Sequence, residues 1–453
     1  MSRRFAAVVW VGFCLASVSA AVSGDELRTT VLDRYVSKPD PAYRWSVVER
    51  HETANGVVYD VDLTSQKWKG ITWKHQLLIC VPSGEFSQDT ALLFIVGGSN
   101  GSRVAIQETA VGLILARLAK VPCAVLRQVP NQPLLGGHKE DSLIAETFVK
   151  FMNGGDEEWL LLLPMTKAAV RAMDATQEIL EKEGVAQIQK FVVTGASKRG
   201  WTTWLTGAVD PRVRAIAPLV IDTLNFHRQL PNQLRMWGKY SEQIHDYTRR
   251  GLTEQLDTPR GRRLVSIVDP YSYRTRYTMP KLIVNGTNDR YWVVDALNNY
   301  WEDLPEPKYA LYVPNAGHGL ESHRDYAVTA VAALVRHVAT RAALPRLKWK
   351  ADYKGDDELV LTVTADQPMV RARLWRADSA NLDFREVRWV PVEMENRNDV
   401  WTGTIRRRAG FNRAVFGDLE FQMGDLRYHL STLVYRLPRL TAPKASEAAA
   451  SGQ

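Results

Sequence analysis

Residues 191–201 read FVVTGASKRGW, an apolar strand that passes through a tight turn of small residues into a helix. A serine at such a corner, here Ser197, carries its hydroxyl above the end of a sheet and beside the N-terminus of the helix. Hydrolases present a nucleophile in this way. The turn departs from the usual G-x-S-x-G pattern, because Arg199 stands where the second glycine is expected and Gly200 follows it. A serine that only caps the helix would fit the same stretch.

Two polar loops after later strands complete a catalytic pattern. The run LIVNGTND at 282–289 ends in Asp289, and YALYVPNAGHG at 309–319 contains the glycine-flanked His318. The order Ser, Asp, His, each just past the carboxyl end of a strand, is that of the α/β-hydrolase triad. We therefore predict Ser197 as nucleophile, His318 as general base and Asp289 as the residue that orients the base.

One further carboxylate competes for the role of the acid. Asp222 directly follows the apolar strand predicted at 213–221, the next strand after the helix of the nucleophile. Some hydrolases take their acid from this earlier strand, so Asp222 replaces Asp289 if Asp289 lies far from His318. The alternative role for Asp222 is a helix cap or an anchor for the segment that follows.

Acyl transfer also needs hydrogen-bond donors for the oxyanion. A glycine-rich loop, GGSNG at 97–101, follows an early strand and precedes the first long helix. In α/β-hydrolases this loop gives one backbone N–H, and the residue after the nucleophile gives the second. We expect Gly98 or Ser99 together with Lys198. The loop lacks the ending of a phosphate-binding loop and no His/Cys pair has metal-ligand spacing, so we predict neither a cofactor nor a metal.

The chain of 453 residues, 45% hydrophobic and 24% charged, has the composition of a globular protein with room for two or three domains. Short β-branched runs alternate with helical stretches from about residue 58 to 341, which indicates an α/β domain whose mostly parallel sheet has helices on both faces. We expect strands at 75–81, 91–96, 123–129, 190–194, 213–221, 281–285 and 309–313, and helices at 104–119, 165–183, 197–209, 293–300 and 326–341. Residues 223–276 do not follow this alternation of strands and helices, which indicates a lid insertion.

The pattern of apolar residues changes after residue 343. Residues 344–440 show period-2 alternation with a strand about every 8–12 residues, which predicts an all-β sandwich. Its strands are expected at 359–364, 370–375, 387–391 and 432–435. The Ala/Ser/Lys-rich residues 441–453 predict a disordered tail.

The first 20 residues have the three parts of a secretory signal peptide: Arg3 and Arg4, an apolar run, and small residues before a cleavage point. The apolar run is shorter than the ~20 residues that span a bilayer. We predict cleavage, export to the periplasm or beyond, a catalytic domain at 21–343, and no stable membrane insertion afterwards. Loss of two arginines lowers the net charge from +8 to +6, and the basic residues are spread along the chain, which argues against a nucleic-acid partner.

Two cysteines remain after cleavage, Cys80 and Cys123, each within an apolar strand-like run. An oxidising compartment permits a disulfide between them. Burial as two small apolar residues is the other interpretation.

Together the motifs resemble the PhoPQ-activated pathogenicity-related proteins, a secreted bacterial family of the α/β-hydrolase type. The resemblance rests on DPAYRW at 40–45, PMTKA at 164–168, GASKRGW at 195–201, NGTND at 285–289, GH at 317–318 and RLW at 373–375. It implies a hydrolase-type domain with a C-terminal β domain, export, and a link to virulence. Ser197, Asp289 and His318 fall on the motif positions of that family. The resemblance supplies no substrate.

The leading hypothesis is a secreted serine hydrolase that acts on a small-molecule, peptide or carbohydrate ester or amide. The alternative is a secreted protein that keeps the fold without catalysis and binds peptides, glycans or envelope components. The sequence leaves open the choice between esterase and peptidase, and the oligomeric state.

Overall fold

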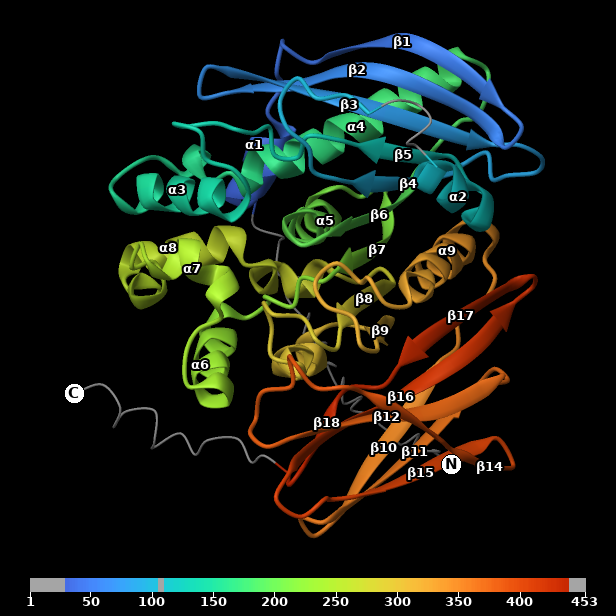
Figure 1. Ribbon diagram of the computed structural model, residues 1–453. Helices are drawn as coiled ribbons and strands as arrows, with labels where there is room; N and C mark the ends of the chain where they lie inside the picture. Colours follow the sequence, from blue (N-terminus) through green and yellow to red (C-terminus); the bar gives the residue numbers. More distant parts are fainter. Residues whose placement is uncertain (1–28, 105–109, 440–453) are drawn as a thin grey trace, which may run out of the picture.

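The computed structural model describes residues 29–104 and 110–439 (Figure 1). The predicted signal peptide at 1–20 and the predicted tail at 441–453 lie outside the described residues. So do residues 105–109 of the helix predicted at 104–119. Within the described ranges, no helix is both long and apolar enough to cross a membrane.

A 14-stranded mixed sheet runs through the molecule. Its first nine strands are β1 (Arg44–Thr53), β2 (Gly56–Trp68), β3 (Ile71–Pro82), β4 (Thr90–Ile95), β5 (Cys123–Leu126), β6 (Lys190–Ala196), β7 (Val213–Leu219), β8 (Lys281–Gly286) and β9 (Lys308–Val313). They lie in the order β1-β2-β3-β5-β4-β6-β7-β8-β9. The pairings from β5 to β9 are parallel, and those from β1 to β5 are antiparallel. This is the α/β-hydrolase type of sheet that the sequence predicts.

Helices cover both faces of the sheet. They are α1 (Val31–Ser37), α2 (Ala110–Ala119), α3 (Glu140–Met152), α4 (Leu162–Lys182), α5 (Lys198–Val209) and α9 (Arg324–Thr340). Neighbouring residues of β6 point to opposite faces, as the period of a strand requires: Phe191 and Val193 pack in the core with α1, α4 and α5, and Val192 packs with α2 and α9. Both faces are buried, which explains the continuous apolar runs of the central strands.

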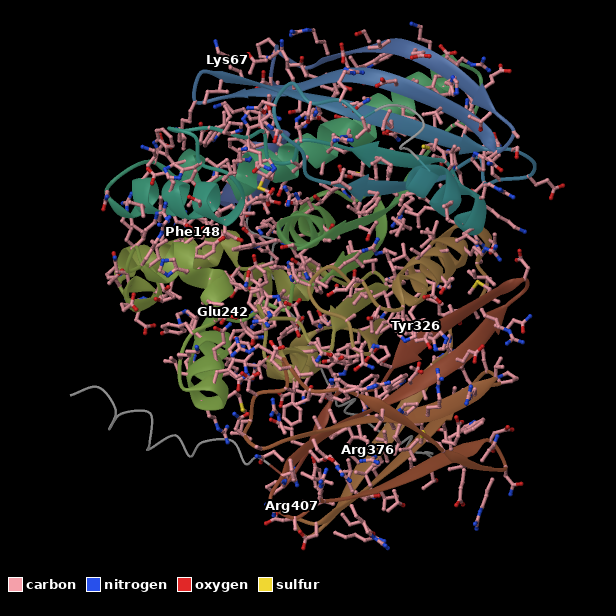
Figure 2. All side chains as sticks on the ribbon, in the orientation of Figure 1. Lys67, Phe148, Glu242, Tyr326, Arg376 and Arg407 are labelled. Carbon is pink, nitrogen blue, oxygen red and sulfur yellow. The ribbon has the colours of Figure 1, made fainter. Side chains whose placement is uncertain are left out.

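A helical insertion (residues 223–276) joins β7 to β8. It contains α6 (Phe226–Trp237), α7 (His245–Thr248) and α8 (Pro259–Val268), with 3₁₀ turns at Glu242–Ile244, Thr253–Gln255 and Pro270–Arg276. Two of its helices, α7 and α8, lie beside α3 (Figure 1). Phe148 of α3 lies at this junction (Figure 2), where its ring centroid is 6.1 Å from that of Tyr247 and 6.3 Å from that of Trp201.

The C-terminal part is a β domain of two sheets. Its strands are β10 (Leu347–Lys354), β11 (Glu358–Ala365), β12 (Arg371–Ser379), β13 (Val390–Glu393), β14 (Glu395–Arg397), β15 (Val400–Arg406), β16 (Asn412–Met423), β17 (Leu426–Ser431) and β18 (Tyr435–Leu437). Strands β10, β11, β15 and β14 form a separate four-stranded sheet. The other sheet continues the large one, because β17 pairs with β9 at Ser431 and Ala310.

Several predicted elements differ from the structure. The helix predicted at 293–300 is wrong: the segment is a turn followed by the short 3₁₀ helix Ala296–Asn299. The strand predicted at 432–435 is misplaced, because β17 ends at Ser431 and β18 begins only at Tyr435. Cys80 and Cys123 are directly paired positions of β3 and β5, both buried, and the two thiols are free.

Candidate active site

Ser197 lies in the turn between β6 and α5, with φ 58° and ψ −123°. A positive φ at a residue with a side chain costs roughly 1–3 kcal/mol and is found mainly at functional sites. Close backbone packing holds the turn: a Cβ on Gly200 would lie 2.6 Å from Cγ2 of Ile221 and 2.9 Å from the carbonyl oxygen of Gly195. Gly200 therefore makes the close approach that the usual motif assigns to the position of Arg199.

The structure brings Ser197, His318 and Asp289 into one chain of hydrogen bonds. His318 Nε2 lies 2.8 Å from Ser197 Oγ, and His318 Nδ1 lies 2.8 Å from Asp289 Oδ2. Asp289 follows β8 and is 4% exposed, and His318 follows β9 and is 28% exposed. Asp289 is thus shielded, while the imidazole is open on one side to a reacting group.

Tyr291 holds this chain in place and was missed by the sequence analysis. Its ring packs on His318 with the centroids 4.2 Å apart and the planes tilted by 31°. Its backbone N–H donates to Asp289 Oδ1 at 2.8 Å, and its hydroxyl donates to Asp141 at 3.0 Å. Only its position two residues after Asp289 could have pointed to it.

Asp141, in α3, interacts through its carboxylate with three donor groups beside Ser197. It accepts hydrogen bonds from the hydroxyls of Tyr247 and Tyr291, both at 3.0 Å, and its carboxylate lies 2.7 Å from Nζ of Lys198. Burial and the neighbouring Asp141 raise the pKa of the Tyr247 hydroxyl well above its usual value, so it remains a donor. The network ties the helical insertion, α3 and α5 together at the mouth of the site.

The predicted oxyanion donors differ in whether their N–H groups already have an acceptor. Lys198 is the first residue of α5, so its N–H has no partner within the helix. In the glycine loop, the N–H of Ser99 donates to Ser102 Oγ at 3.3 Å. The N–H of Gly98 has no acceptor among the described residues. Of the two predicted loop donors, Gly98 is therefore the one that is available.

Arg199 lies beneath that glycine loop. Its Nε donates to the carbonyl of Val129 at 2.6 Å, and its two Nη atoms donate to the carboxylate of Glu140 at 2.7 and 2.6 Å. A Cβ on Gly97 would lie 2.6 Å from Nη2 of Arg199. Burial alone would raise the pKa of Glu140, but the hydrogen bonds from Arg199 and Gln132 and the positive charges of Arg199 and Lys198 together outweigh it and lower the pKa to about 2. The ion pair between Arg199 and Glu140 thus persists over the ordinary pH range and supports the loop.

Asp222, the alternative acid, has other partners. Its side chain accepts hydrogen bonds from Nδ2 of Asn285 at 3.0 Å and from the hydroxyl of Tyr300. Burial raises its pKa to about 7. The Nδ1 atom of His318 is bonded to Asp289 instead.

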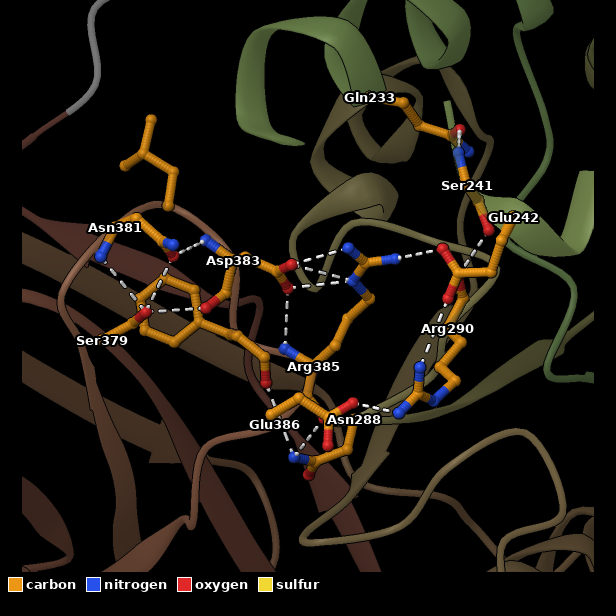
Figure 3. Close-up of polar contacts among 12 residues, drawn as sticks. Gln233, Ser241, Glu242, Asn288, Arg290, Ser379, Asn381, Asp383, Arg385 and Glu386 are labelled. Atoms are coloured by element: carbon orange, nitrogen blue, oxygen red, sulfur yellow. Dashed lines mark hydrogen bonds and ion pairs between the residues drawn. The ribbon is translucent and has the colours of Figure 1, made fainter. Parts of the chain in front are cut away.

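Two spaces adjoin the hydrogen-bonded chain. An apolar cavity of about 100 Å³ has Ser197 in its wall, and a polar groove of about 570 Å³ has His318 in its wall. Figure 3 shows the charged contacts beside this groove, among them those of Arg290 and Arg385. Within the described part of the chain, no cluster of three or more His, Cys, Asp or Glu side chains could hold a metal ion.

Comparisons with known proteins place the chain in a family. The PhoPQ-activated pathogenicity-related protein family matches residues 32–385. Autocrine proliferation repressor protein A of Dictyostelium discoideum is 35% identical over 379 residues, which cover 80% of this chain and 76% of the relative. Among solved structures, an acetyl xylan esterase from Paenibacillus sp. R4 is 17% identical, with a TM-score of 0.45 over 67% of this chain and 92% of the esterase. A glucuronoyl esterase from Solibacter usitatus is 14% identical, with a TM-score of 0.40 over 66% of this chain and 87% of the esterase. The chain belongs to the PhoPQ-activated pathogenicity-related protein family.

Proposed function

We propose that this protein is a serine hydrolase that cleaves an ester or amide through an acyl-enzyme on Ser197. The observation that carries the proposal is the unbroken hydrogen-bond chain from Ser197 Oγ through both ring nitrogens of His318 to Asp289. A serine that only capped α5 would direct its oxygen to the helix, yet Ser197 makes no side-chain cap hydrogen bond.

Each residue has a defined part in the proposed reaction. Asp289 accepts a hydrogen bond from the N–H at Nδ1 of His318, so Nε2 is free to take the proton of Ser197 as Oγ attacks the carbonyl carbon. The N–H groups of Lys198 and Gly98 stabilise the oxyanion. His318 then gives its proton to the leaving group, and a water molecule releases the acyl group by the same steps in reverse.

The test of the proposal is the variant Ser197→Ala. A fluorophosphonate should label the wild-type protein at Ser197 and fail to label the variant, and hydrolysis of activated esters should fall by roughly 10⁴–10⁶-fold. Ser266→Ala, at an exposed serine of α8, is the matched control and should behave as the wild type. Turnover that survives in Ser197→Ala would remove Ser197 from the mechanism.

The second candidate is a binding protein without catalysis. It draws on the relative from Dictyostelium discoideum, whose name describes a repressor of proliferation and not an enzyme. Folded wild-type protein that neither takes the fluorophosphonate nor cleaves any ester would favour this candidate.

We further propose that the chain is exported, and the support is the signal-peptide pattern at 1–20. N-terminal sequencing of protein recovered from the periplasm or medium should begin at residue 21 or 22. A link to virulence would rest on the description of the family alone.

A further inference from the structure

The nucleophile and the base line two different spaces. Ser197 lines the apolar cavity and His318 does not, whereas His318 lines the polar groove and Ser197 does not. Tyr291 lines both and forms the boundary between them. Since the two ends of a substrate would have to lie on the two sides of this boundary, the chemistry of each space indicates what each end is.

The cavity is built for an apolar group. Its wall comes from α3, α5 and the helical insertion and includes Phe148, Trp201, Phe226, Leu230, Ile244 and Leu252. The charged side chains and the glutamine in the wall are already bonded: Asp141 to Lys198 and two tyrosines, and Gln229 to the carbonyls of Leu224 and Ala296. Oγ1 of Thr253 and Nε1 of Trp292 have no partner among the described residues, but both atoms are neutral, so a charged group would find no opposite charge there. The volume of about 100 Å³ is of the order of the ~150 Å³ apolar cavity that binds benzene.

The groove is polar, and its main charges are matched. Arg290 forms ion pairs with Glu242 and Glu386, and Arg385 pairs with Asp383 and Glu242 (Figure 3). The wall also holds Arg388 and Glu321, whose charges are opposite. The groove therefore carries little net charge to attract an ion, while it offers many donors and acceptors to hydroxyl groups. The loop that carries Arg385 and Glu386 belongs to the C-terminal β domain, so that domain would contact the substrate.

The positions of the reacting atoms assign the two ends of the substrate to the two spaces. Ser197 Oγ bonds to the carbonyl carbon, so the acyl group must lie on the side of the cavity. His318 Nε2 must reach first Oγ and then the leaving oxygen, which places the leaving group in the groove. The Oγ–acyl bond forms, the bond between the acyl carbon and the leaving oxygen breaks, and the proton moves from Oγ through Nε2 to that oxygen.

We propose that the substrate is an ester that joins a compact apolar acyl group, aromatic or medium-chain aliphatic, to a neutral, hydroxyl-rich alcohol. This inference rests on the proposed function, since it requires Ser197 to be the nucleophile. It goes further by naming both halves of the substrate and by giving the C-terminal β domain a part in binding the alcohol.

The acyl half is tested with p-nitrophenyl acetate, hexanoate and benzoate. Wild-type kcat/KM should be at least tenfold higher for hexanoate or benzoate than for acetate. Leu230→Trp fills the cavity and should lower the ratio of kcat/KM for the larger esters to that for acetate at least tenfold. Leu234→Trp, one turn along α6 at a residue that is 42% exposed, is the matched control and should keep the wild-type profile. If Leu230→Trp fails to fold, Phe226→Ala enlarges the cavity and should shift the preference toward octanoate.

The alcohol half is tested with a fixed acyl group. Glycerol monohexanoate should be cleaved at least tenfold faster than pentyl hexanoate. A preference for acetate, an unchanged acyl profile in the cavity variants, or faster cleavage of pentyl hexanoate would overturn the inference. Fluorophosphonate labelling of Ser197 separates the two failures: if Ser197 is labelled, the serine hydrolase stands and only the substrate class is wrong, and if it is not, both fall.

Discussion

Replacement of Asp289 by Asn should nearly abolish activity, and the structure gives the reason. Asp289 Oδ1 accepts a hydrogen bond from the backbone N–H of Tyr291, and Oδ2 accepts one from the N–H at Nδ1 of His318, each at 2.8 Å. In Asp289→Asn, the amide oxygen must face the N–H of Tyr291, so the NH₂ group faces Nδ1. His318 then has to carry its proton on Nε2, where it cannot accept the proton of Ser197.

The size of the effect follows from this change of tautomer. The same substitution in a trypsin triad lowers kcat by about 10⁴-fold, equal to about 5.4 kcal/mol of transition-state stabilisation. We expect a loss of that order in Asp289→Asn. Asp222→Asn should stay within about tenfold of the wild type, because Asp222 bonds to Asn285 and Tyr300 and not to the imidazole.

The assay compares kcat/KM of the two variants on one p-nitrophenyl ester together with the rate of fluorophosphonate labelling. Urea midpoints of both proteins show whether each variant remains folded. The reasoning is refuted if Asp289→Asn loses less than about tenfold, or if Asp222→Asn loses as much as Asp289→Asn while folded. The second result would assign the acid to Asp222.

Three more predictions concern the surroundings of the site. Gly97→Ala should lower kcat/KM at least tenfold, because its Cβ would meet the guanidinium of Arg199. The loss should be smaller in an Arg199→Ala background. Equal losses in both backgrounds would show that the two residues are uncoupled. Gly200→Ala should lower the free energy of unfolding by about 1–3 kcal/mol, since its Cβ would overlap Ile221, and an unchanged urea midpoint would contradict this. Burial raises the pKa of Asp222 to about 7, against about 3.9 for an aspartate in water. Between these pH values the folded state holds a proton that the unfolded state releases, so this group stabilises the fold at low pH and that contribution is lost as pH rises through 7. Between pH 5 and 7 the wild type should lose about 2 kcal/mol more stability than Asp222→Asn, and parallel pH profiles of the urea midpoint would show that Asp222 does not titrate there.

The central strands and the order of the candidate triad could be predicted because they are local features. Strands such as β6 and β8 are buried on both faces, so they read as continuous apolar runs that end in polar loops. By contrast, β1 was missed because it is the edge strand and most of its residues are partly or fully exposed. Its apolar face is limited to Trp45 and Val47, which are half-buried, so its sequence shows a strand period over only a few residues.

Contacts between distant segments could not be predicted. Asp141 and Tyr291 are 150 residues apart, yet they share a hydrogen bond beside the nucleophile. The single pairing that joins the β domain to the large sheet links Ala310 to Ser431. Neither contact leaves a mark on the pattern of its own segment, because an Asp in the first turn of a helix or a Tyr in a loop is consistent with many partners. Such networks follow only from the packed fold.

The irregular turn at Ser197 shows how a departure from a motif can itself be structural. Within this turn glycine is needed at Gly195 and Gly200, because an added Cβ would lie 2.7 Å from the carbonyl oxygen of Arg199 and 2.9 Å from that of Gly195, respectively. Position 199 is therefore free to carry a long side chain, and Arg199 uses it to reach Glu140 and the carbonyl of Val129. Its guanidinium in turn occupies the space in which a Cβ of Gly97 would lie. The turn at Ser197 and the glycine loop at 97–101, which are about 100 residues apart in the sequence, thus form one unit: the arginine in the turn requires the glycine in the loop.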